Sequence, residues 1–294
     1  MINKIIKQFS SQHIKKIGVI GSGQMGTGIA IVGNRVSQLQ VKIIDNNLAS
    51  LQKSRKFTED WCDKEIGKKR LTSEQKFDIL SRFSYSTQLE ELHETDFVIE
   101  AVSEDFLIKQ KIFSTLDKIL PKNTIIASNT SSISLTKIAS TTSRPEKVIG
   151  MHFMNPVPVM KLIEVIRGLQ TSEETLNITL DLAKRMEKTT VQAKDYPGFI
   201  ANRLLMPYIN EAIYALYEGV ATVQDIDQTM KLGTNVPMGP LTLADFIGLD
   251  TCLSIMKVLH SELGDSKYRP CPLLVNYVNA GYLGKKTGRG FYNY

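Results

Sequence analysis

A short apolar run that breaks into three spaced glycines constrains the fold of this chain most. Residues 17–20 are Ile-Gly-Val-Ile, and Gly21, Gly23 and Gly26 follow with the spacing Gly-x-Gly-x-x-Gly. At such a strand-to-helix turn, the first glycine permits the turn, the second lets a phosphate approach the backbone, and the third lets the helix pack closely on the sheet. The helix amino terminus then presents unpaired N–H groups and a partial positive charge to the anion. The residues predicted to hold a pyrophosphate are Gly21, Ser22, Gly23, Gln24, Met25 and Gly26.

A second apolar run, residues 41–44, ends in Asp45. In a dinucleotide-binding fold, a carboxylate at this point accepts hydrogen bonds from the adenosine ribose. It would repel the 2′-phosphate of NADP, so the sequence predicts NAD as the cofactor. The alternative is a glycine-rich turn followed by a solvated aspartate. The order of strand, loop, helix and acid favours the cofactor site.

Apolar strands alternate with helical stretches from residue 14 to the segment Asp195-Tyr196-Pro197-Gly198. This alternation predicts an α/β, Rossmann-like, mostly parallel sheet with helices on both faces. Strand character then stops, and an all-helical C-terminal domain is expected. We therefore expect an N-terminal extension (1–13), an NAD-binding domain (14–197) and a helical substrate and dimerisation domain (198–294). The expected helices include one continuous segment over 48–81 and three in the second domain, over 199–217, 222–231 and 241–263.

Charge and composition favour some partners over others. The 294 residues carry 36 basic and 30 acidic side chains, a net charge of +6. The two signs are interspersed and no aromatic-basic stripe is present, so nucleic acid is not an expected partner.

No apolar run approaches the roughly 20 residues of a membrane span. Three cysteines without ligand spacing predict neither disulfides nor a metal site. The basic residues of the helix after Asp45 suit an anionic ligand, or alternatively form a solvated face.

The amino terminus is basic and amphipathic. Residues 1–44 contain no Asp or Glu, and the first sixteen hold four lysines. This composition is typical of a transit segment and indicates a location in the mitochondrial matrix. The alternative is a disordered or docked amino terminus in a cytoplasmic protein.

His152 and Glu164 are the candidate catalytic pair. His152 ends a predicted strand, while Glu164 lies in an apolar run where an unpartnered charge would be costly. A histidine is suited to take a hydroxyl proton while hydride leaves the same carbon, and a carboxylate partner fixes its tautomer. Ser131 and Asn202 are candidates to donate hydrogen bonds to the reacting oxygen. Alternatively, those two residues are loop and helix caps.

Several motifs, in order along the chain, resemble the short-chain L-3-hydroxyacyl-CoA and 3-hydroxybutyryl-CoA dehydrogenases from Lys16 to Tyr294. Beside the glycine loop, they occupy residues 98–104, 127–132, 151–158, 197–203, 237–240 and 284–292. The resemblance implies NAD-dependent, reversible oxidation of a short-chain L-3-hydroxyacyl-CoA to the 3-ketoacyl-CoA, in fatty-acid β-oxidation or butanoate metabolism. It also implies a homodimer formed through the C-terminal domain.

The resemblance also implies roles for individual residues. His152 matches the family's catalytic histidine and Glu164 its acid partner. Ser131 and Asn202 match residues that contact the substrate, and Lys68 matches a lysine that contacts coenzyme A. Cofactor contacts are implied for Glu104, Lys109, Ser131, Asn155 and Lys286. The chain departs from the family pattern in the polar segment Asn34–Ser37 and at Trp61.

Two rival functions share this fold. A dehydrogenase of sugar acids such as L-gulonate would use the same His-Glu pair. A structural, crystallin-like recruit would have no catalytic role, but the intact pair of His152 and Glu164 argues against lost catalysis.

Overall fold

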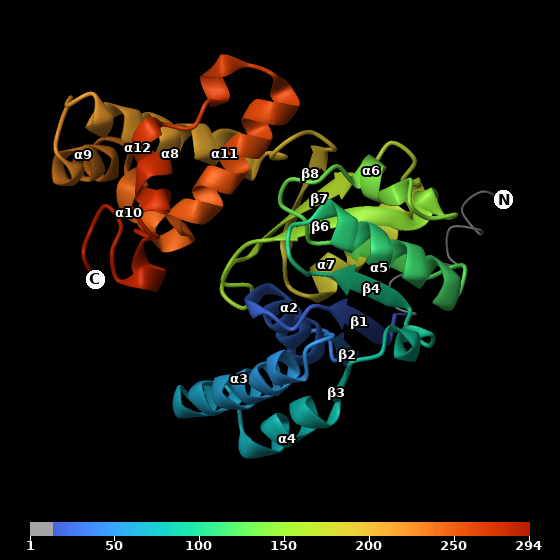
Figure 1. The fold of residues 1–294 in the computed structure, drawn as a ribbon. Coiled ribbons are helices and arrows are strands. Elements are labelled where there is room, and N and C mark those ends of the chain that lie inside the picture. Colours follow the sequence, from blue (N-terminus) through green and yellow to red (C-terminus); the bar gives the residue numbers. More distant parts are fainter. Residues whose placement is uncertain (1–13) are drawn as a thin grey trace. The chain divides into compact units, whose positions relative to one another are not determined.

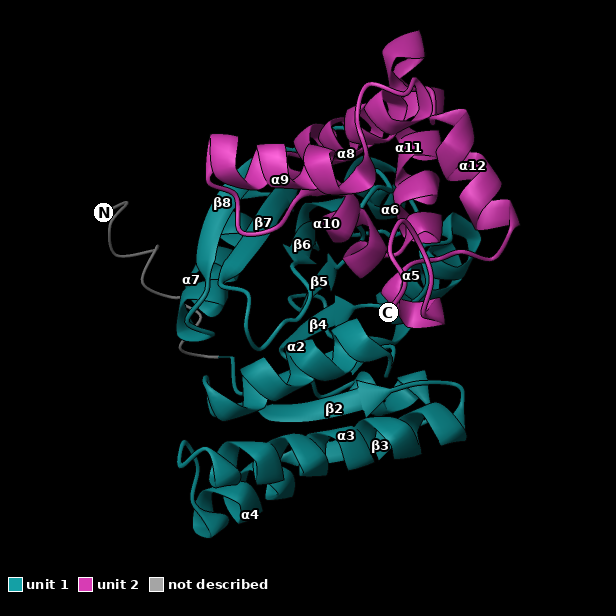
Figure 2. Cartoon of the chain, turned by 90° about the vertical axis from the view of Figure 1, so that its left-hand side faces the viewer, with its two compact units in different colours: residues 1–196 teal, residues 197–294 magenta. Residues whose placement is uncertain are grey.

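The computed structural model describes residues 14–294 in two compact units (Figures 1 and 2). The first unit ends at Tyr196 and the second runs from Pro197 to Tyr294. The expected transit segment over residues 1–13 lies outside the described residues, so a mitochondrial location stays a prediction.

The described part of the first unit contains an eight-stranded sheet in the order β3-β2-β1-β4-β5-β6-β7-β8. Its strands are β1 Lys16–Ile20, β2 Gln40–Ile44, β3 Phe83–Ser86, β4 Phe97–Glu100, β5 Ile125–Ser128, β6 Val148–Phe153, β7 Leu162–Arg167 and β8 Thr189–Lys194. Neighbouring strands are parallel except for β6 and β7. The predicted Rossmann-like architecture is confirmed.

Both faces of this sheet are buried, because side chains on successive residues of its central strands point to opposite sides and are all covered. On one face, Ile17, Val19 and Ile99 pack with residues of α2 and α7. The helices of the unit are α2 Gln24–Arg35, α3 Leu48–Gly67, α4 Ser73–Ser81, α5 Phe106–Ile119, α6 Leu135–Ala139 and α7 Glu173–Arg185.

The turn from β1 into α2 depends on its glycines. Gly21 has a φ of +98°, a left-handed conformation that favours glycine. A Cβ atom at Gly26 would lie 1.9 Å from the carbonyl oxygen of Gly21, so α2 packs against the turn only without a side chain there. This close packing places the amino terminus of α2 at the carboxyl end of β1.

The second unit is helical, as predicted. Its helices are α8 Ala201–Tyr217, α9 Val223–Thr234, α10 Pro240–Ile247, α11 Leu249–Leu263 and α12 Pro272–Asn279. They enclose a core of their own, in which Ile213, Leu241 and Met256 are almost fully buried. None of the described helices is both long and apolar enough to cross a membrane. The described residues also contain no His, Cys, Asp or Glu cluster that could hold a metal ion.

Two predicted helices were wrong in their extent. The segment over 48–81 is two helices, because Lys69 is left-handed (φ 57°) and Thr72 starts α4 with a capping box completed by Gln75. The segment over 241–263 is likewise two helices, because Gly248 has a φ of +103° between α10 and α11.

The close contact at Gly26 generates a stability prediction. We expect Gly26→Ala to lower the free energy of unfolding by about 3 kcal/mol, since the new methyl group meets rigid backbone. Gly67→Ala is the control, because a Cβ there meets nothing within 4 Å. It should change the free energy by less than about 1 kcal/mol, in the stabilising direction. Urea unfolding of both variants measures the difference, and equal stability would contradict the packing argument.

Candidate active site

The candidate catalytic pair is formed across the antiparallel strands β6 and β7. His152 and Glu164 face each other in the strand register. The Nδ1 atom of His152 lies 2.7 Å from Oε2 of Glu164, and the two residues are 6% and 1% exposed. The predicted contact between these residues is therefore confirmed. A carboxylate on Nδ1 favours the tautomer that leaves Nε2 as the hydrogen-bond acceptor.

Ser131 completes a hydroxyl–imidazole–carboxylate line. It lies in the loop after β5, and its Oγ atom is 3.1 Å from Nε2 of His152. Strands β5 and β6 are adjacent and parallel, so their carboxyl ends bring this loop to His152. This arrangement lets Nε2 of His152 accept a proton, and the carboxylate of Glu164 then stabilises the resulting positive charge on the imidazole.

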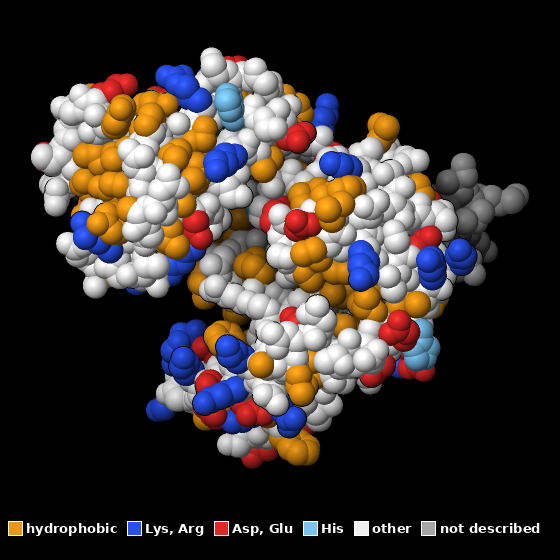
Figure 3. Space-filling model, viewed as in Figure 1, with side chains coloured by type: hydrophobic (Ala, Val, Ile, Leu, Met, Phe, Trp, Pro, Cys, Tyr) orange, Lys and Arg blue, Asp and Glu red, His pale blue; other side chains and the backbone are white. Residues whose placement is uncertain are grey.

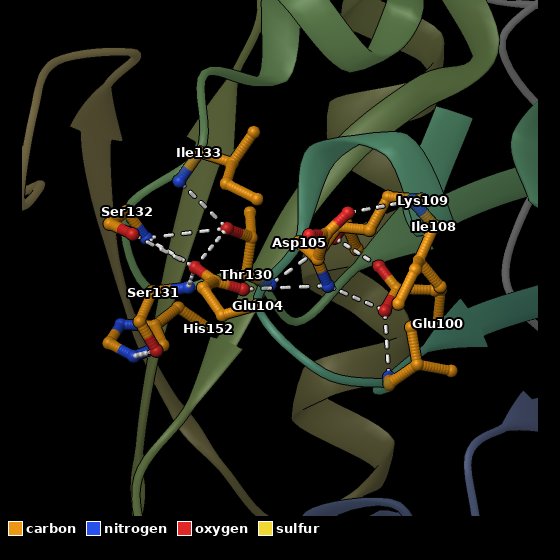
Figure 4. Close-up of polar contacts among 12 residues, drawn as sticks. Glu100, Glu104, Asp105, Ile108, Lys109, Thr130, Ser131, Ser132, Ile133 and His152 are labelled. Carbon is orange, nitrogen blue, oxygen red and sulfur yellow. Dashed lines mark hydrogen bonds and ion pairs between the residues drawn. The ribbon is translucent and has the colours of Figure 1, made fainter. Parts of the chain in front are cut away.

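Glu104 holds the backbone of the loop that carries Ser131 (Figure 4). Its Oε1 atom accepts hydrogen bonds from Ser131 N at 2.7 Å, Ser132 N at 2.9 Å and Thr130 Oγ1 at 2.6 Å. Burial raises the pKa of the Glu104 carboxyl, but the nearby Lys109 ammonium and these hydrogen bonds outweigh it and hold the pKa below its ordinary value. The carboxylate is thus kept ionised and able to accept these hydrogen bonds.

The predicted cofactor loop and Asp45 lie together at the carboxyl ends of β1 and β2. Ser22 donates its N–H (2.8 Å) and its Oγ hydroxyl (2.7 Å) to Oδ2 of Asp45. Gly21, Gly23 and Asp45 line a cavity of about 660 Å³ in the first unit.

These residues fit a dinucleotide. A Cβ at Gly23 would point into open space, so the backbone there is accessible to a phosphate. The first turn of α2 has no acidic residue, and no described side chain caps it, which suits an anion at the helix amino terminus. When bound, NAD would place its pyrophosphate on this loop and its adenosine ribose toward Asp45.

The remaining predicted cofactor residues occupy different surroundings. Asn155 accepts a hydrogen bond from Gln24 of the glycine loop at 3.0 Å. Lys109 is only 1% exposed, with its ammonium 2.6 Å from Glu100 and 3.5 Å from Glu104. It therefore acts on the site through these carboxylates, and a direct contact with the cofactor stays a prediction. Lys286 lies in the second unit, where its ammonium pairs with Asp250 at 2.5 Å.

The other predicted substrate residues, Asn202 and Lys68, lie on helices or at helix ends. Asn202 lies in the first turn of α8 in the second unit and is 8% exposed. Lys68 follows the end of α3, with an exposed side chain 3.7 Å from Glu65. Trp61, where the family pattern is broken, lies under the Arg35 guanidinium at 5.2 Å. The structure thus brings together Ser131, His152, Glu164 and Glu104, while the roles of Asn202, Lys68 and Lys286 stay predictions.

Sequence reasoning missed the role of Glu100 beneath this loop. Glu100 ends the apolar strand β4 and is fully buried. The same signal that singled out Glu164, a carboxylate directly after apolar residues, could have identified it.

A dinucleotide-binding sheet with a hydroxyl–imidazole–carboxylate line at its carboxyl edge defines a class of protein, the nicotinamide-dependent oxidoreductases. The chain belongs to the 3-hydroxyacyl-CoA dehydrogenase family. The model of the family's NAD binding domain matches residues 16–196, and that of its C-terminal domain matches residues 198–294. The resemblance stated from the sequence motifs is confirmed, and NAD is the cofactor of this domain.

Individual relatives are similar over nearly their whole length. A probable 3-hydroxybutyryl-CoA dehydrogenase of Bacillus subtilis is 56% identical, over 96% of this chain and 98% of the relative. The 3-hydroxybutyryl-CoA dehydrogenase of Bradyrhizobium diazoefficiens is 51% identical, over 96% of each chain. The crystal structure of (S)-3-hydroxybutyryl-CoA dehydrogenase from Ralstonia eutropha matches with a TM-score of 0.92 and 49% identity, over 96% of this chain and 99% of that one.

The position of Asp45 generates a prediction of cofactor preference. We expect kcat/KM to favour NADH over NADPH by at least about tenfold, because the 2′-phosphate would lie against a carboxylate. Asp45→Asn should narrow that ratio, since the amide keeps the acceptor for Ser22 but loses the charge. Asp96→Asn is the control, because Asp96 accepts hydrogen bonds from the backbone of Lys15 and Lys16 at the start of β1. Equal efficiency with both cofactors in the wild type would show that Asp45 does not face the ribose.

Proposed function

We propose that this protein catalyses the NAD-dependent, reversible oxidation of a short-chain L-3-hydroxyacyl-CoA, such as 3-hydroxybutyryl-CoA, to the 3-ketoacyl-CoA. The observation that carries the proposal is the line of Ser131, His152 and Glu164 on the sheet that holds the glycine loop. The names of the similar proteins support the substrate class. A reversible reaction of this kind would serve fatty-acid β-oxidation or butanoate metabolism.

His152 is the proposed general base. Its Nε2 atom takes the proton of the 3-hydroxyl group while the hydrogen on the same carbon departs as hydride. The nicotinamide ring of NAD supplies the hydride acceptor when the cofactor is bound. Glu164, 2.7 Å from Nδ1, stabilises the imidazolium and keeps the ring in one orientation. In the reverse direction, the imidazolium returns its proton to the oxygen of the 3-keto group.

Ser131 is proposed to orient the reacting oxygen. Its hydroxyl is already within hydrogen-bond distance of Nε2, and Glu104 fixes its backbone. A hydroxyl held there can donate a hydrogen bond to the oxygen as charge develops on it. From the family resemblance, Asn202 is proposed to assist at the substrate, Lys68 at coenzyme A, and Lys286 and Asn155 at the cofactor.

We also propose a homodimer formed through the second unit. Large apolar side chains remain exposed there, including Leu204 (66%), Val220 (72%) and Leu232 (77%). Figure 3 shows hydrophobic side chains gathered over one face of this unit. A unit of this size that leaves so much apolar surface in water is better stabilised by covering it with a second copy.

The proposed reaction predicts that the protein consumes NADH with acetoacetyl-CoA. The expected kcat/KM is within the range of ordinary enzymes, about 10⁴–10⁸ M⁻¹s⁻¹. Oxidation of L-gulonate with NAD should be negligible, because a sugar acid lacks the coenzyme A portion that the basic residues after Asp45 are proposed to bind. Folded protein that is inactive on acetoacetyl-CoA, or faster on L-gulonate, would contradict the proposal.

The proposed assembly predicts a mass in solution of twice 32.9 kDa at micromolar concentration. Val220→Glu combined with Leu232→Glu should shift the protein toward the monomer, because a buried unpaired charge is costly. Leu169→Glu is the control, since Leu169 is 86% exposed in the first unit. Analytical ultracentrifugation measures the mass of the wild type, the double variant and the control, and a monomeric wild type would contradict the proposal.

A further inference from the structure

Glu100 is a fully buried carboxylate that the proposed reaction does not use. It ends strand β4 with 0% exposure, in the same unit as His152. Three donors converge on its carboxylate. Oε1 accepts from Lys109 Nζ at 2.6 Å and from Val102 N at 2.8 Å, and Oε2 accepts from Ser128 Oγ at 2.6 Å. A carboxylate is retained at such a depth only when its charge is paired and its oxygens are satisfied.

The first connection from Glu100 to the site runs through Lys109. The Lys109 ammonium, held by Glu100, also lies 3.5 Å from Oε2 of Glu104. The other oxygen of Glu104, Oε1, accepts hydrogen bonds from the backbone N–H groups of Ser131 and Ser132 (Figure 4). Two carboxylates thus share one buried ammonium. The position of that ammonium between them fixes where the carboxylate of Glu104 can sit.

The second connection runs through Ser128. Its hydroxyl donates to Glu100 and accepts the N–H of Thr130 at 3.2 Å. Thr130 then donates its hydroxyl to Glu104 at 2.6 Å and accepts the N–H of Ile133 at 2.9 Å. The loop is therefore attached to Glu100 from both sides, and both connections meet at Glu104. The main-chain carbonyl of Glu100 also accepts the N–H of Asn129 at 2.7 Å.

We propose that Glu100 is a positioning residue, the buried anchor of a clamp that fixes the loop of residues 129–133 and so holds the Ser131 hydroxyl on His152. Lys109, Ser128 and Thr130 are the intermediate members of the clamp, and Glu104 is its contact with the loop backbone. The kinetic test of this proposal rests on the proposed function, whereas the test by amide hydrogen exchange does not.

The kinetic test is a double-mutant cycle between Glu100 and Ser131. Glu100→Gln offers one acceptor oxygen in place of two and no charge for Lys109, so the clamp loosens. In the wild-type background, kcat with acetoacetyl-CoA should fall by roughly tenfold to a hundredfold, the effect of a small misplacement at a reacting centre. In the Ser131→Ala background, the same substitution should change kcat by less than about twofold, because the hydroxyl that it positions is gone. Equal losses in both backgrounds would overturn the proposal.

A general loss of stability is separated from positioning by a matched control. Arg144 and Asp117 form another ion pair in the first unit, 2.8 Å apart and 3% and 15% exposed. Asp117→Asn should lower the melting temperature without lowering kcat. If it lowers kcat as much as Glu100→Gln, the effect of Glu100 is only structural and the proposal fails.

If Glu100→Gln does not fold, two milder changes take its place in the cycle. Glu100→Gln combined with Lys109→Met leaves no unpaired charge at these two buried positions, which costs less than removing one partner, while Glu104 keeps its hydrogen bonds from the loop. Ser128→Ala cuts only the second connection. Both should lower kcat in the wild-type background and lose that effect in the Ser131→Ala background. An undiminished effect in the second background would contradict the clamp for these variants as well.

Amide hydrogen exchange tests the clamp independently of activity. The N–H groups of Ser131 and Ser132 donate hydrogen bonds to Glu104, which should slow their exchange, so Glu100→Gln should raise exchange in a peptide covering residues 129–134 by at least about tenfold. Peptides from the second unit and the Asp117→Asn variant should show no such rise in this loop. Unchanged exchange would overturn the clamp, whereas an inactive wild type with the expected exchange would overturn only the proposed reaction.

Discussion

The antiparallel pairing of β6 with β7 is the interaction on which the site depends. Among the described strands it is the one pair that reverses the parallel direction of the sheet, and it returns the chain so that Glu164 faces His152 twelve residues after it. Both side chains are buried, and the hydrogen bond between them offsets the free-energy cost of burying each one. The imidazole is then positioned by the sheet, and its Nε2 atom lies 3.1 Å from the Ser131 hydroxyl in the loop after β5.

Local chemistry made much of this predictable from the sequence. The glycine spacing and Asp45 are readable because each residue meets a steric or electrostatic demand set within one strand-turn-helix unit. The contact between His152 and Glu164 is predictable for another reason. A carboxylate within an apolar run needs a partner, and the short connection between two strands offers one. The role of Lys286 rests on the resemblance alone, because no local signal at that position indicates it. For Asn202 and Lys68, the local signals of an amide donor and a basic helix are too general to assign a role without the resemblance.

The features that the sequence did not reveal depend on tertiary contacts. The edge strands β3 and β8 are partly exposed and lack the apolar runs of the central strands, so they were not predicted. The breaks at Lys69 and Gly248 depend on positive φ angles, which the hydrophobic pattern of a helix does not reveal. The clamp below Ser131 joins β4, α5 and the loop after β5, and Glu100 becomes recognisable only when these elements are packed together.

A double-mutant cycle between His152 and Glu164 tests most directly whether the two residues act as one base. His152→Gln and Glu164→Gln should each lower kcat with acetoacetyl-CoA, by about 10²–10⁴ for the histidine. The dissociation constant for NADH should change by less than about twofold in each, because the cofactor lies on the glycine loop and Asp45. The double variant should be little worse than either single one, as for residues that work as a unit. Losses that simply multiply would contradict the account, since the two residues would then act independently.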